Sequence, residues 1–348
     1  MPTIQDVARY ANVSVSTVSN VLNRRSERMR PETLARVQAA IEVLSFRPNR
    51  LARQLKTGHT PLLGLLVPSM TNPVYGVIAK EIETFAQELA GHRLLLGSTY
   101  RDKQKEAEFF ADLLDHGVRR VIVISSLADE RHLEAAVDRG MVVVSYDRRA
   151  IAGQRSKVAH IAPDNFAAAR MAASHLIAHG HTRLAFVTVA GLTVSRSDKI
   201  AGFHDAVEAA GLRAGAQVID GGPLNEYGDS VVAEVGRSTG LRLAQASDRP
   251  TGLVALNDLM AIGLMAGLRE GGLSVPADVS VIGLDGLFIS ALTHPRLTTV
   301  QMPMREMARA MVERVMAPRG DPQDDEERES IFAPAELCAR ESVARPPD

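Results

Sequence analysis

The sequence lacks the features that mark secreted and membrane-spanning proteins. Its single cysteine, Cys338, excludes an internal disulfide and any zinc site built from several cysteines. No apolar run approaches the roughly 18 residues that a membrane helix needs, and no positively charged segment followed by an apolar one opens the chain. We therefore expect a cytoplasmic protein that makes no contact with a membrane.

Motifs of catalysis and nucleotide binding are missing as well. No G-x-G-x-x-G follows an apolar run, and no G-x-x-x-x-G-K-[ST], G-x-S-x-G or H-E-x-x-H occurs. His175 and His179 are four residues apart, but no acidic ligand completes a metal set, and the end of a predicted helix favours histidine. The sequence predicts no catalytic residue, no metal and no cofactor, and so no enzyme.

Charge is divided unevenly along the chain, although the whole carries only −1. Residues 1–58 contain ten basic and four acidic residues, which gives +6, and the remaining residues sum to −7. A basic end on an acidic body is suited to holding phosphates with one part of the molecule only.

The basic end has the pattern of a helix-turn-helix. Thr3 with Asp6 predicts a capped first helix, and Ser14 is a good N-cap for a second helix that ends at Leu22. Short polar side chains cover the outside of the second helix, where they allow close approach to base edges. A third helix is predicted from Pro31, and residues 47–58 form a short basic segment that is too short to be a stable helix alone.

Three segments of this region, Thr3–Ala8, Val13–Asn23 and Pro48–Ala52, resemble the DNA-binding head and hinge of the LacI/GalR family of bacterial repressors. The resemblance implies that the recognition helix presents Val15, Ser16, Ser19 and Asn20 to the bases. It also implies that Leu55 enters the minor groove at the operator centre and kinks it. The other residues expected at the DNA are Thr3, Ile4, Gln5, Asn23, Arg30, Thr33, Arg47, Asn49, Arg50, Arg53 and Lys56.

Two positions depart from the family pattern. Many relatives carry arginine where this chain has Asn20, so we expect a different base preference there. Relatives usually place serine or threonine where this chain has Arg30, which cannot cap a helix with a hydroxyl and is expected at a phosphate instead.

From residue 62 onward, short apolar runs alternate with helical stretches. Strands that are buried on both faces have this pattern, and the spacing predicts a doubly wound α/β domain with a parallel sheet. The predicted strands are Leu62–Val67, Leu94–Gly97, Val121–Ser125, Met141–Tyr146, Leu184–Val189, Leu253–Leu256 and Val279–Leu284.

The resemblance continues through this region. The segments that carry it are Gly64–Pro68, Thr71–Tyr75, Asp147-Arg148, Asp164-Asn165, Gly202-Phe203, Leu256–Ala261, Leu297–Val300 and Arg340–Ser342. It implies a sensor domain similar to periplasmic binding proteins, with two lobes and a ligand between them. We expect a head over 1–46, a hinge over 47–60 and a sensor over 61–348. Lobe 1 is expected at about 61–160 and 292–320, and lobe 2 at about 163–289 and 325–344. The three crossovers are then expected near 160–163, 288–293 and 320–326.

The effector is expected to contact Tyr75, Asp147, Lys199, Tyr227 and Asp258. Carboxylates accept bonds from sugar hydroxyls, a cation meets a carboxylate or ring oxygen, and an aromatic ring packs on an apolar sugar face. Alternatives stay open: Asp258 follows a predicted strand and suits a helix N-cap, and both tyrosines suit ordinary half-buried positions. Relatives usually carry arginine at Lys199 and often a second aspartate at Gly286.

These observations predict a repressor that binds a pseudo-palindromic, double-stranded operator as a homodimer under the control of a small molecule, such as a sugar. Control by a corepressor such as a nucleobase, or by a protein partner, is an alternative. A solute-binding protein without a regulatory role is a remote one, because the basic head and the missing signal peptide oppose it. No leucine heptads follow Arg340–Ser342, so a tetramerising coiled coil is not expected.

Overall fold

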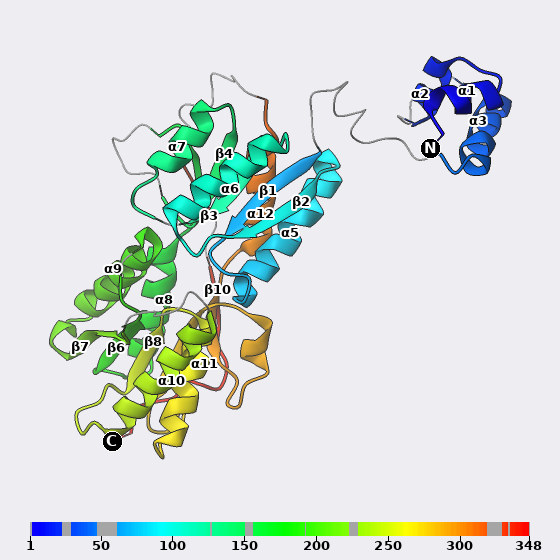
Figure 1. Cartoon of the computed structure of the whole chain (residues 1–348). Helices are drawn as coiled ribbons and strands as arrows, with labels where there is room; N and C mark the ends of the chain where they lie inside the picture. Colours follow the sequence, from blue (N-terminus) through cyan, green and yellow to red (C-terminus); the bar gives the residue numbers. More distant parts are fainter. Residues whose placement is uncertain are drawn as a thin grey trace. The chain divides into compact units, whose positions relative to one another are not determined.

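The computed structural model describes residues 2–22, 29–46, 61–125, 127–149, 156–191, 193–222, 229–318, 329–332 and 335–347. The chain divides into two compact units, residues 1–60 and 61–348 (Figure 1). Within the described residues, none of the helices combines the length and the apolar character of a membrane span.

The described residues of the first unit form a small bundle of three helices, α1 (Ile4–Tyr10), α2 (Val15–Leu22) and α3 (Pro31–Val43). Val7, Val18 and Val37, one from each helix, are buried together in its core. Thr3 and Asp6 form the expected capping box at the start of α1. Arg30 provides no side-chain cap for α3, which begins instead at Pro31.

The second unit contains two six-stranded sheets. The first sheet has the order β11-β5-β4-β3-β1-β2, and all of its pairings are parallel. Its strands are β1 (Leu62–Val67), β2 (Arg93–Ser98), β3 (Arg120–Ile124), β4 (Val142–Tyr146), β5 (Ala159–Pro163) and β11 (Glu329–Phe332). Helices α5 (Pro73–Ala90), α6 (Lys103–Asp115), α7 (Arg131–Asp138) and α12 (Met304–Met316) pack around it. We call this layered structure lobe 1.

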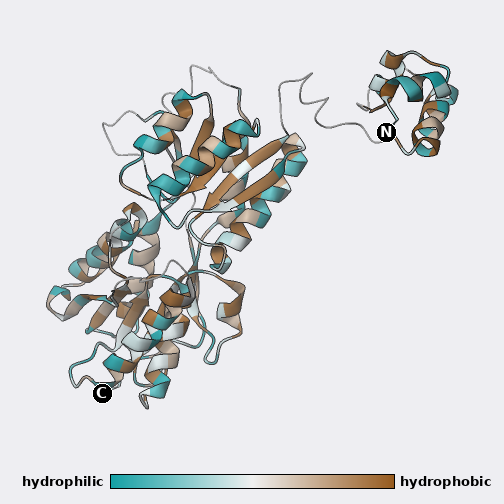
Figure 2. Cartoon of the chain, in the orientation of Figure 1, coloured by the Kyte–Doolittle hydropathy of each residue, from teal (hydrophilic) through white to brown (hydrophobic). Residues whose placement is uncertain are grey.

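Lobe 2 is built around the sheet of order β12-β10-β9-β8-β6-β7. Its strands are β6 (Leu184–Thr188), β7 (Ala216–Asp220), β8 (Gly252–Ala255), β9 (Ser280–Asp285), β10 (Thr298–Gln301) and β12 (Glu336–Cys338), the last of which is antiparallel to β10. Its α-helices are α8 (Asn165–Ala178), α9 (Val194–Ala209), α10 (Asp229–Gln245) and α11 (Asp258–Glu270), with short 3-10 turns η1 (Arg213–Gly215) and η2 (Phe288–Ala291). In both lobes the strands are apolar and the outer faces of the helices are polar (Figure 2).

The doubly wound fold that the sequence predicted is confirmed. All seven predicted runs form strands. Six of them are buried between helices on both faces of a parallel sheet, whereas β2, at the edge of its sheet, is apolar but largely exposed. Five strands, β5, β7, β10, β11 and β12, were not predicted. They are short, and β7 and β12 are partly exposed, so neither a long apolar run nor a strict alternation marks them.

The expected lobe boundaries need correction. Strand β10 pairs with β9 in lobe 2, so the second crossover falls at residues 302–303, between β10 and α12, and not near 288–293. Strand β11 pairs with β5 in lobe 1, so the third crossover follows residue 332 and not residues 320–326. The first crossover, at residue 164, follows the end of β5. These pairings depend on which sheet edge is available, which local sequence does not encode.

Helices α10 and α11 approach each other closely over glycines. A Cβ atom on Gly267 would lie 1.9 Å from the carbonyl oxygen of Arg237, and one on Gly263 would lie 1.9 Å from that of Ala233. The backbones therefore touch where a side chain would force them apart. Two residues separate the end of β8 from the start of α11, so the N-terminus of this helix lies at the carboxyl end of that strand.

Candidate functional site

The recognition helix α2 separates an inner apolar face from an outer polar face. Val18 is fully buried, whereas Ser16 and Asn20 are exposed and Val15 is 42% exposed. The hydroxyl of Ser14 accepts a hydrogen bond of 3.2 Å from the backbone N–H of Thr17, which caps the helix as predicted. The helix thus presents short polar groups and one apolar side chain on its outside, a surface that suits a major groove.

The other expected DNA contacts of the head are placed around this helix. Thr3 and Gln5 are exposed at the start of α1, and Ile4 packs partly against the core. Arg30 is exposed and Thr33 is half-buried at the start of α3. The remaining expected contacts lie outside the described residues: Asn23, Arg47, Asn49, Arg50, Arg53, Leu55 and Lys56.

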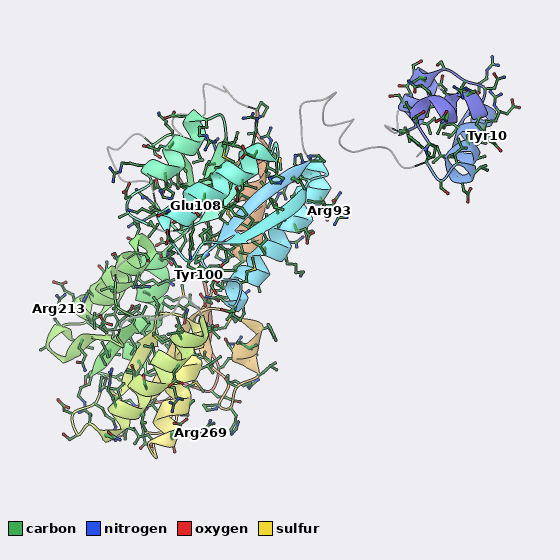
Figure 3. All side chains as sticks on the ribbon, viewed as in Figure 1. Tyr10, Arg93, Tyr100, Glu108, Arg213 and Arg269 are labelled. Carbon is green, nitrogen blue, oxygen red and sulfur yellow. The ribbon has the colours of Figure 1, made fainter. Side chains whose placement is uncertain are left out.

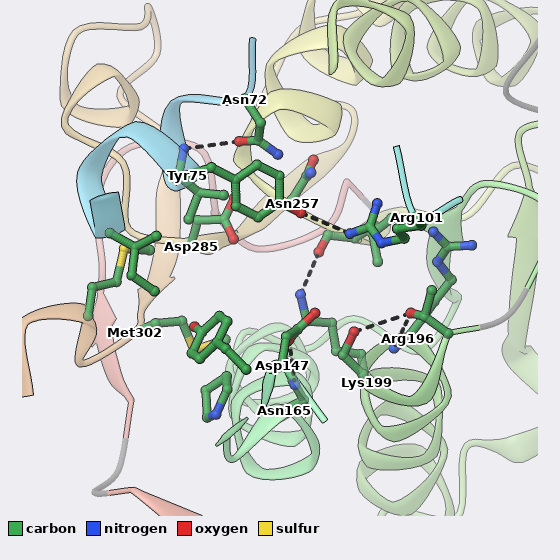
Figure 4. A pocket seen from close by; sticks show the side chains of 18 residues that line it. Asn72, Tyr75, Arg101, Asp147, Asn165, Arg196, Lys199, Asn257, Asp285 and Met302 are labelled. Carbon is green, nitrogen blue, oxygen red and sulfur yellow. Dashed lines mark hydrogen bonds between the residues drawn. The ribbon is translucent and has the colours of Figure 1, made fainter. Parts of the chain in front are cut away.

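A cavity of about 700 Å³, partly open to solvent, lies between the lobes of the second unit (Figure 4). It is bordered by the carboxyl ends of parallel strands, where doubly wound folds bind their ligands. The lining residues are Asn72, Val74, Tyr75, Ile78, Arg101, Tyr146, Asp147, Pro163, Asn165, Thr193, Ser195, Arg196, Lys199, Leu256, Asn257, Asp285, Met302 and Met304.

Lobe 1 contributes an aromatic ring, a guanidinium and a carboxylate. The Nη2 atom of Arg101 donates a hydrogen bond of 2.8 Å to the hydroxyl of Tyr75, which stands near the start of α5. Asp147 follows β4 with a left-handed backbone, φ 70°, and its N–H donates to the carbonyl of Ile161 at 3.1 Å. Its Oδ1 accepts a bond of 3.3 Å from Asn165 of lobe 2, so this carboxylate touches both lobes.

Lobe 2 contributes two cations, an amide and a second carboxylate. Lys199, on α9, donates to the carbonyl of Leu256 at 3.2 Å. Asn257 is the N-cap of α11 and accepts a bond of 2.9 Å from the N–H of Met260. Asp285 ends β9, and burial, followed by the charge of Asp258, raises its pKa well above the ordinary value. Its Oδ2 is buried without a hydrogen-bond partner among the described residues.

Asp258 does not line this cavity, which corrects its expected role as an effector contact. Its side chain is fully buried, and its Oδ2 accepts from the N–H of Leu287 at 2.8 Å and the hydroxyl of Ser290 at 2.5 Å. Its Oδ1 accepts from the hydroxyl of Thr299 at 2.5 Å. The helix cap is Asn257, so the N-cap alternative for Asp258 is also wrong. These three donors leave Asp258 a structural carboxylate.

The structure brings together three of the five expected contacts, Tyr75, Asp147 and Lys199. Tyr227 lies outside the described residues. Sequence reasoning missed Arg101, Arg196, Asn257 and Asp285. Asn257 and Asp285 directly follow or end predicted strands, a position that points to the carboxyl edge of a parallel sheet. No comparable signal marks the two arginines.

The head and the cleft define a class of protein: a DNA-binding regulator with a two-lobed ligand-binding domain. Residues 3–49 match the model of bacterial regulatory proteins of the lacI family, and residues 173–343 match a periplasmic binding protein-like domain.

Similar proteins span nearly the whole chain. The HTH-type transcriptional regulator GalR of Escherichia coli (strain K12) is 32% identical over 348 residues, which cover 99% of this chain and 97% of GalR. The structure of the Lac repressor dimer bound to operator and the anti-inducer ONPF has 25% identity and a TM-score of 0.81, covering 99% of each chain. The structure of the regulator CelR in complex with cellobiose has 25% identity and a TM-score of 0.67, covering 98% of this chain and 100% of CelR.

This chain belongs to the lacI family of bacterial regulatory proteins. It is a DNA-binding transcriptional regulator and not an enzyme, as the sequence predicted.

Proposed function

We propose that this regulator is a cytoplasmic repressor that binds a pseudo-palindromic operator as a homodimer, and that a small molecule in the cleft controls this binding. The observation that carries the proposal is the cavity between the lobes, whose polar lining comes from both of them. The Lac repressor dimer on its operator, with an anti-inducer bound, supports the same arrangement.

Polar contacts already join the two lobes, so a ligand bound in the cleft can change the spacing of the lobes. Arg149, just after β4, donates to both carboxylate oxygens of Asp198 on α9, at 2.9 and 2.5 Å. Asp147 and Asn165 form a second bridge. A ligand that contacts both walls favours one spacing of the lobes over others, and only such differential affinity shifts a conformational equilibrium.

Exposed apolar side chains support a homodimer. Val77, Leu89, Leu95 and Leu96 are exposed on α5 and β2 of lobe 1. Phe288 and Leu292, at and just beyond η2 in lobe 2, are 69% and 75% exposed. In Figure 1, α5, β2 and the orange η2 segment lie along the same side of the second unit. Exposed apolar side chains of this kind are typical of an interface, and two copies present two heads to one operator.

For the head, we propose that Val15, Ser16, Ser19 and Asn20 contact bases, and that Arg30 contacts a phosphate. We also propose that the hinge, residues 47–60, becomes ordered when it binds DNA and that Leu55 enters the minor groove. These roles rest on the exposed face of α2 and on the family resemblance.

Selection of binding sites from randomised DNA by the full-length protein tests this function. We expect the selected DNA sequences to share a pseudo-palindromic consensus. Sedimentation should give the mass of two chains, and the affinity for the operator should fall steeply as the salt concentration rises. Compounds from a thermal-shift screen of sugars, sugar acids and nucleobases are then added to the protein–operator complex. A change in operator affinity in either direction supports control by the cleft.

The matched variants are Asn20→Ala and Arg30→Ala. The first should change the preferred base at one position in each half-site, and the second should weaken binding to all sequences similarly. A stable monomer, a consensus without symmetry, or cleft ligands that leave operator affinity unchanged would each contradict the proposal.

A further inference from the structure

The charges that line the cleft are unequal. Among the described lining residues, Arg101, Arg196 and Lys199 are basic, whereas Asp147 and Asp285 are acidic. Asp285 is buried, and the resulting rise in its pKa favours the neutral form. The cleft without ligand therefore carries an excess of positive charge that both lobes supply.

Arg101 reaches the cleft from a turn with an uncommon backbone. Tyr100 and Arg101 both have φ 55°, a left-handed conformation that side-chain-bearing residues seldom adopt twice in succession. Two backbone hydrogen bonds hold the turn. The N–H of Tyr100 donates to the carbonyl of Pro68 at 3.0 Å, and the N–H of Asp102 donates to the carbonyl of Thr99 at 2.9 Å. Tyr100 is labelled in Figure 3, near the junction of the lobes. Such strain persists where the surroundings impose it, commonly at ligand sites.

Arg196 is fixed in the opposite wall. It is only 9% exposed, and its Nη1 donates to the backbone carbonyls of Val189 and Gly191 and, at 3.1 Å, to that of Ala190. Its Nε is buried and has no hydrogen-bond partner among the described residues. The bonds of Nη1 hold the guanidinium rigidly in the wall of the cavity, where it is pre-organised to bind a ligand.

The two guanidinium groups act on each other. Burial, and next the positive charge of Arg101, lower the pKa of Arg196 to about 10. Two like charges facing one cavity repel each other, and an anion between them would remove that repulsion. The N-termini of α5 and α9 border the same cavity, and their dipoles also favour negative charge.

We infer that the effector is an acidic polyol, a sugar acid or a sugar phosphate, whose carboxylate or phosphate is bound by Arg101 and Arg196. Guanidinium groups bind both anions through paired, charge-assisted hydrogen bonds. Asp147, Asn257 and Asp285 provide acceptors and donors for the hydroxyl groups. This inference rests on the proposed function, because it names the ligand class of the same cleft.

Matched pairs of compounds test the ligand class by calorimetry with the full-length protein. The pairs are D-gluconate with D-glucitol, D-galactonate with galactitol, D-glucuronate with D-glucose, and D-glucose 6-phosphate with D-glucose, at equal ionic strength. At least one acid should bind 10-fold or more tightly than its neutral partner. Because carboxylates and phosphates are tested in separate pairs of compounds, the result also shows which of the two anions the cleft binds.

The decisive variant is Arg101→Gln, which keeps a long polar side chain and removes the charge. It should lower the preference for the acid about 10-fold, the loss expected for one charge-assisted contact. The control is Arg139→Gln, which removes an exposed charge of lobe 1 at the end of α7, away from the residues that line the cleft, and should leave the preference unchanged. Inorganic phosphate alone should raise the melting temperature of the wild type more than that of Arg101→Gln.

The outcomes separate this inference from the function on which it rests. A neutral polyol that binds the cleft and alters operator affinity, with no preference for any acid, would overturn the inference and leave the function intact. Acids that bind through Arg101 without any effect on the operator would support the inference and contradict the proposed control. If no acid of the panel binds and phosphate has no effect, the inference is wrong.

Discussion

The two lobes share a topology but differ in where they bury charge. Lobe 1 places carboxylates in internal pairs: Glu106 bonds to His132 at 2.6 Å, and Glu130 bonds to His160 at 2.8 Å. Lobe 2 places its buried carboxylates, Asp258 and Asp285, at the end of its sheet nearest the cleft. Asp258 is bonded internally like the buried carboxylates of lobe 1, whereas Asp285 lines the cleft, so lobe 2 uses one buried carboxylate for internal bonding and places the other at the candidate ligand site.

The lobes also pack their helices differently. Helices α10 and α11 of lobe 2 touch backbone to backbone over glycines, whereas helix α5 of lobe 1 carries Gly76 with open space around it. Close backbone packing leaves no room for a side chain, and open surface accepts one. Substitutions at Gly267 and at Gly76 should therefore have opposite effects. The following variants test these two differences between the lobes, from the largest expected effect to the smallest.

Gly267→Val should destabilise the second unit by about 4 kcal/mol, because the new Cβ meets a backbone carbonyl that cannot move without separating α10 from α11. Urea denaturation measures the change. The matched control is Gly76→Ala on α5, which should be neutral or stabilise by about 0.5 kcal/mol. Equal effects at the two glycines would remove this difference between the lobes.

Glu106→Ala should destabilise lobe 1 by about 2 kcal/mol, because His132 and the hydroxyl of Ser125 lose a buried partner. Glu106 does not line the cleft, so the affinity for cleft ligands should not change. Denaturation and calorimetry measure the two quantities. Glu108→Ala, two residues further along α6 and exposed, should change neither by more than about 0.5 kcal/mol. A weaker ligand affinity in Glu106→Ala would show that this pair is coupled to the cleft.

Asp285→Asn should raise the melting temperature of the unliganded protein by about 2–4 °C near neutral pH. Burial raises the pKa of Asp285 in the folded state well above the ordinary value of an aspartate. A group whose pKa is raised in the folded state stabilises the fold fully when the pH lies below its pKa in the unfolded chain. This stabilisation is lost as the pH rises through its pKa in the folded state. Asparagine does not titrate, so the advantage of the variant should grow between pH 4 and pH 8.

Asp258→Asn serves as the comparison for this pH series. Its carboxylate accepts bonds from three donors, and the NH2 group that replaces one oxygen in asparagine turns a donating group toward some of those donors. The melting temperature should therefore fall. A fall in both variants, or a difference between Asp285→Asn and the wild type that does not vary with pH, would show that both aspartates are structural.

Local sequence determined much of this protein. The period of apolar residues in the head placed Val7, Val18 and Val37 in its core and left Val15 and Asn20 outside, because a helix of 3.6 residues per turn separates two faces by spacing alone. Seven strands followed from continuous apolar runs. The order of the motifs along the chain was enough to indicate the lacI family. The chain belongs to this family, so that prediction is confirmed.

The tertiary structure decided the rest. Strand β10 lies between β9 and β12 in lobe 2, and β11 forms an edge of the lobe 1 sheet. These pairings, which local sequence does not encode, place two crossovers elsewhere than expected. Asp258 and Asp285 have the same side chain near the same edge. Only their neighbours make the first structural and leave the second with an oxygen that has no partner among the described residues. Arg101 and Arg196 lie on different lobes and meet only because the chain crosses between the sheets. Burial, partner atoms and the proximity of distant residues are properties of the folded chain, so no pattern in the sequence states them.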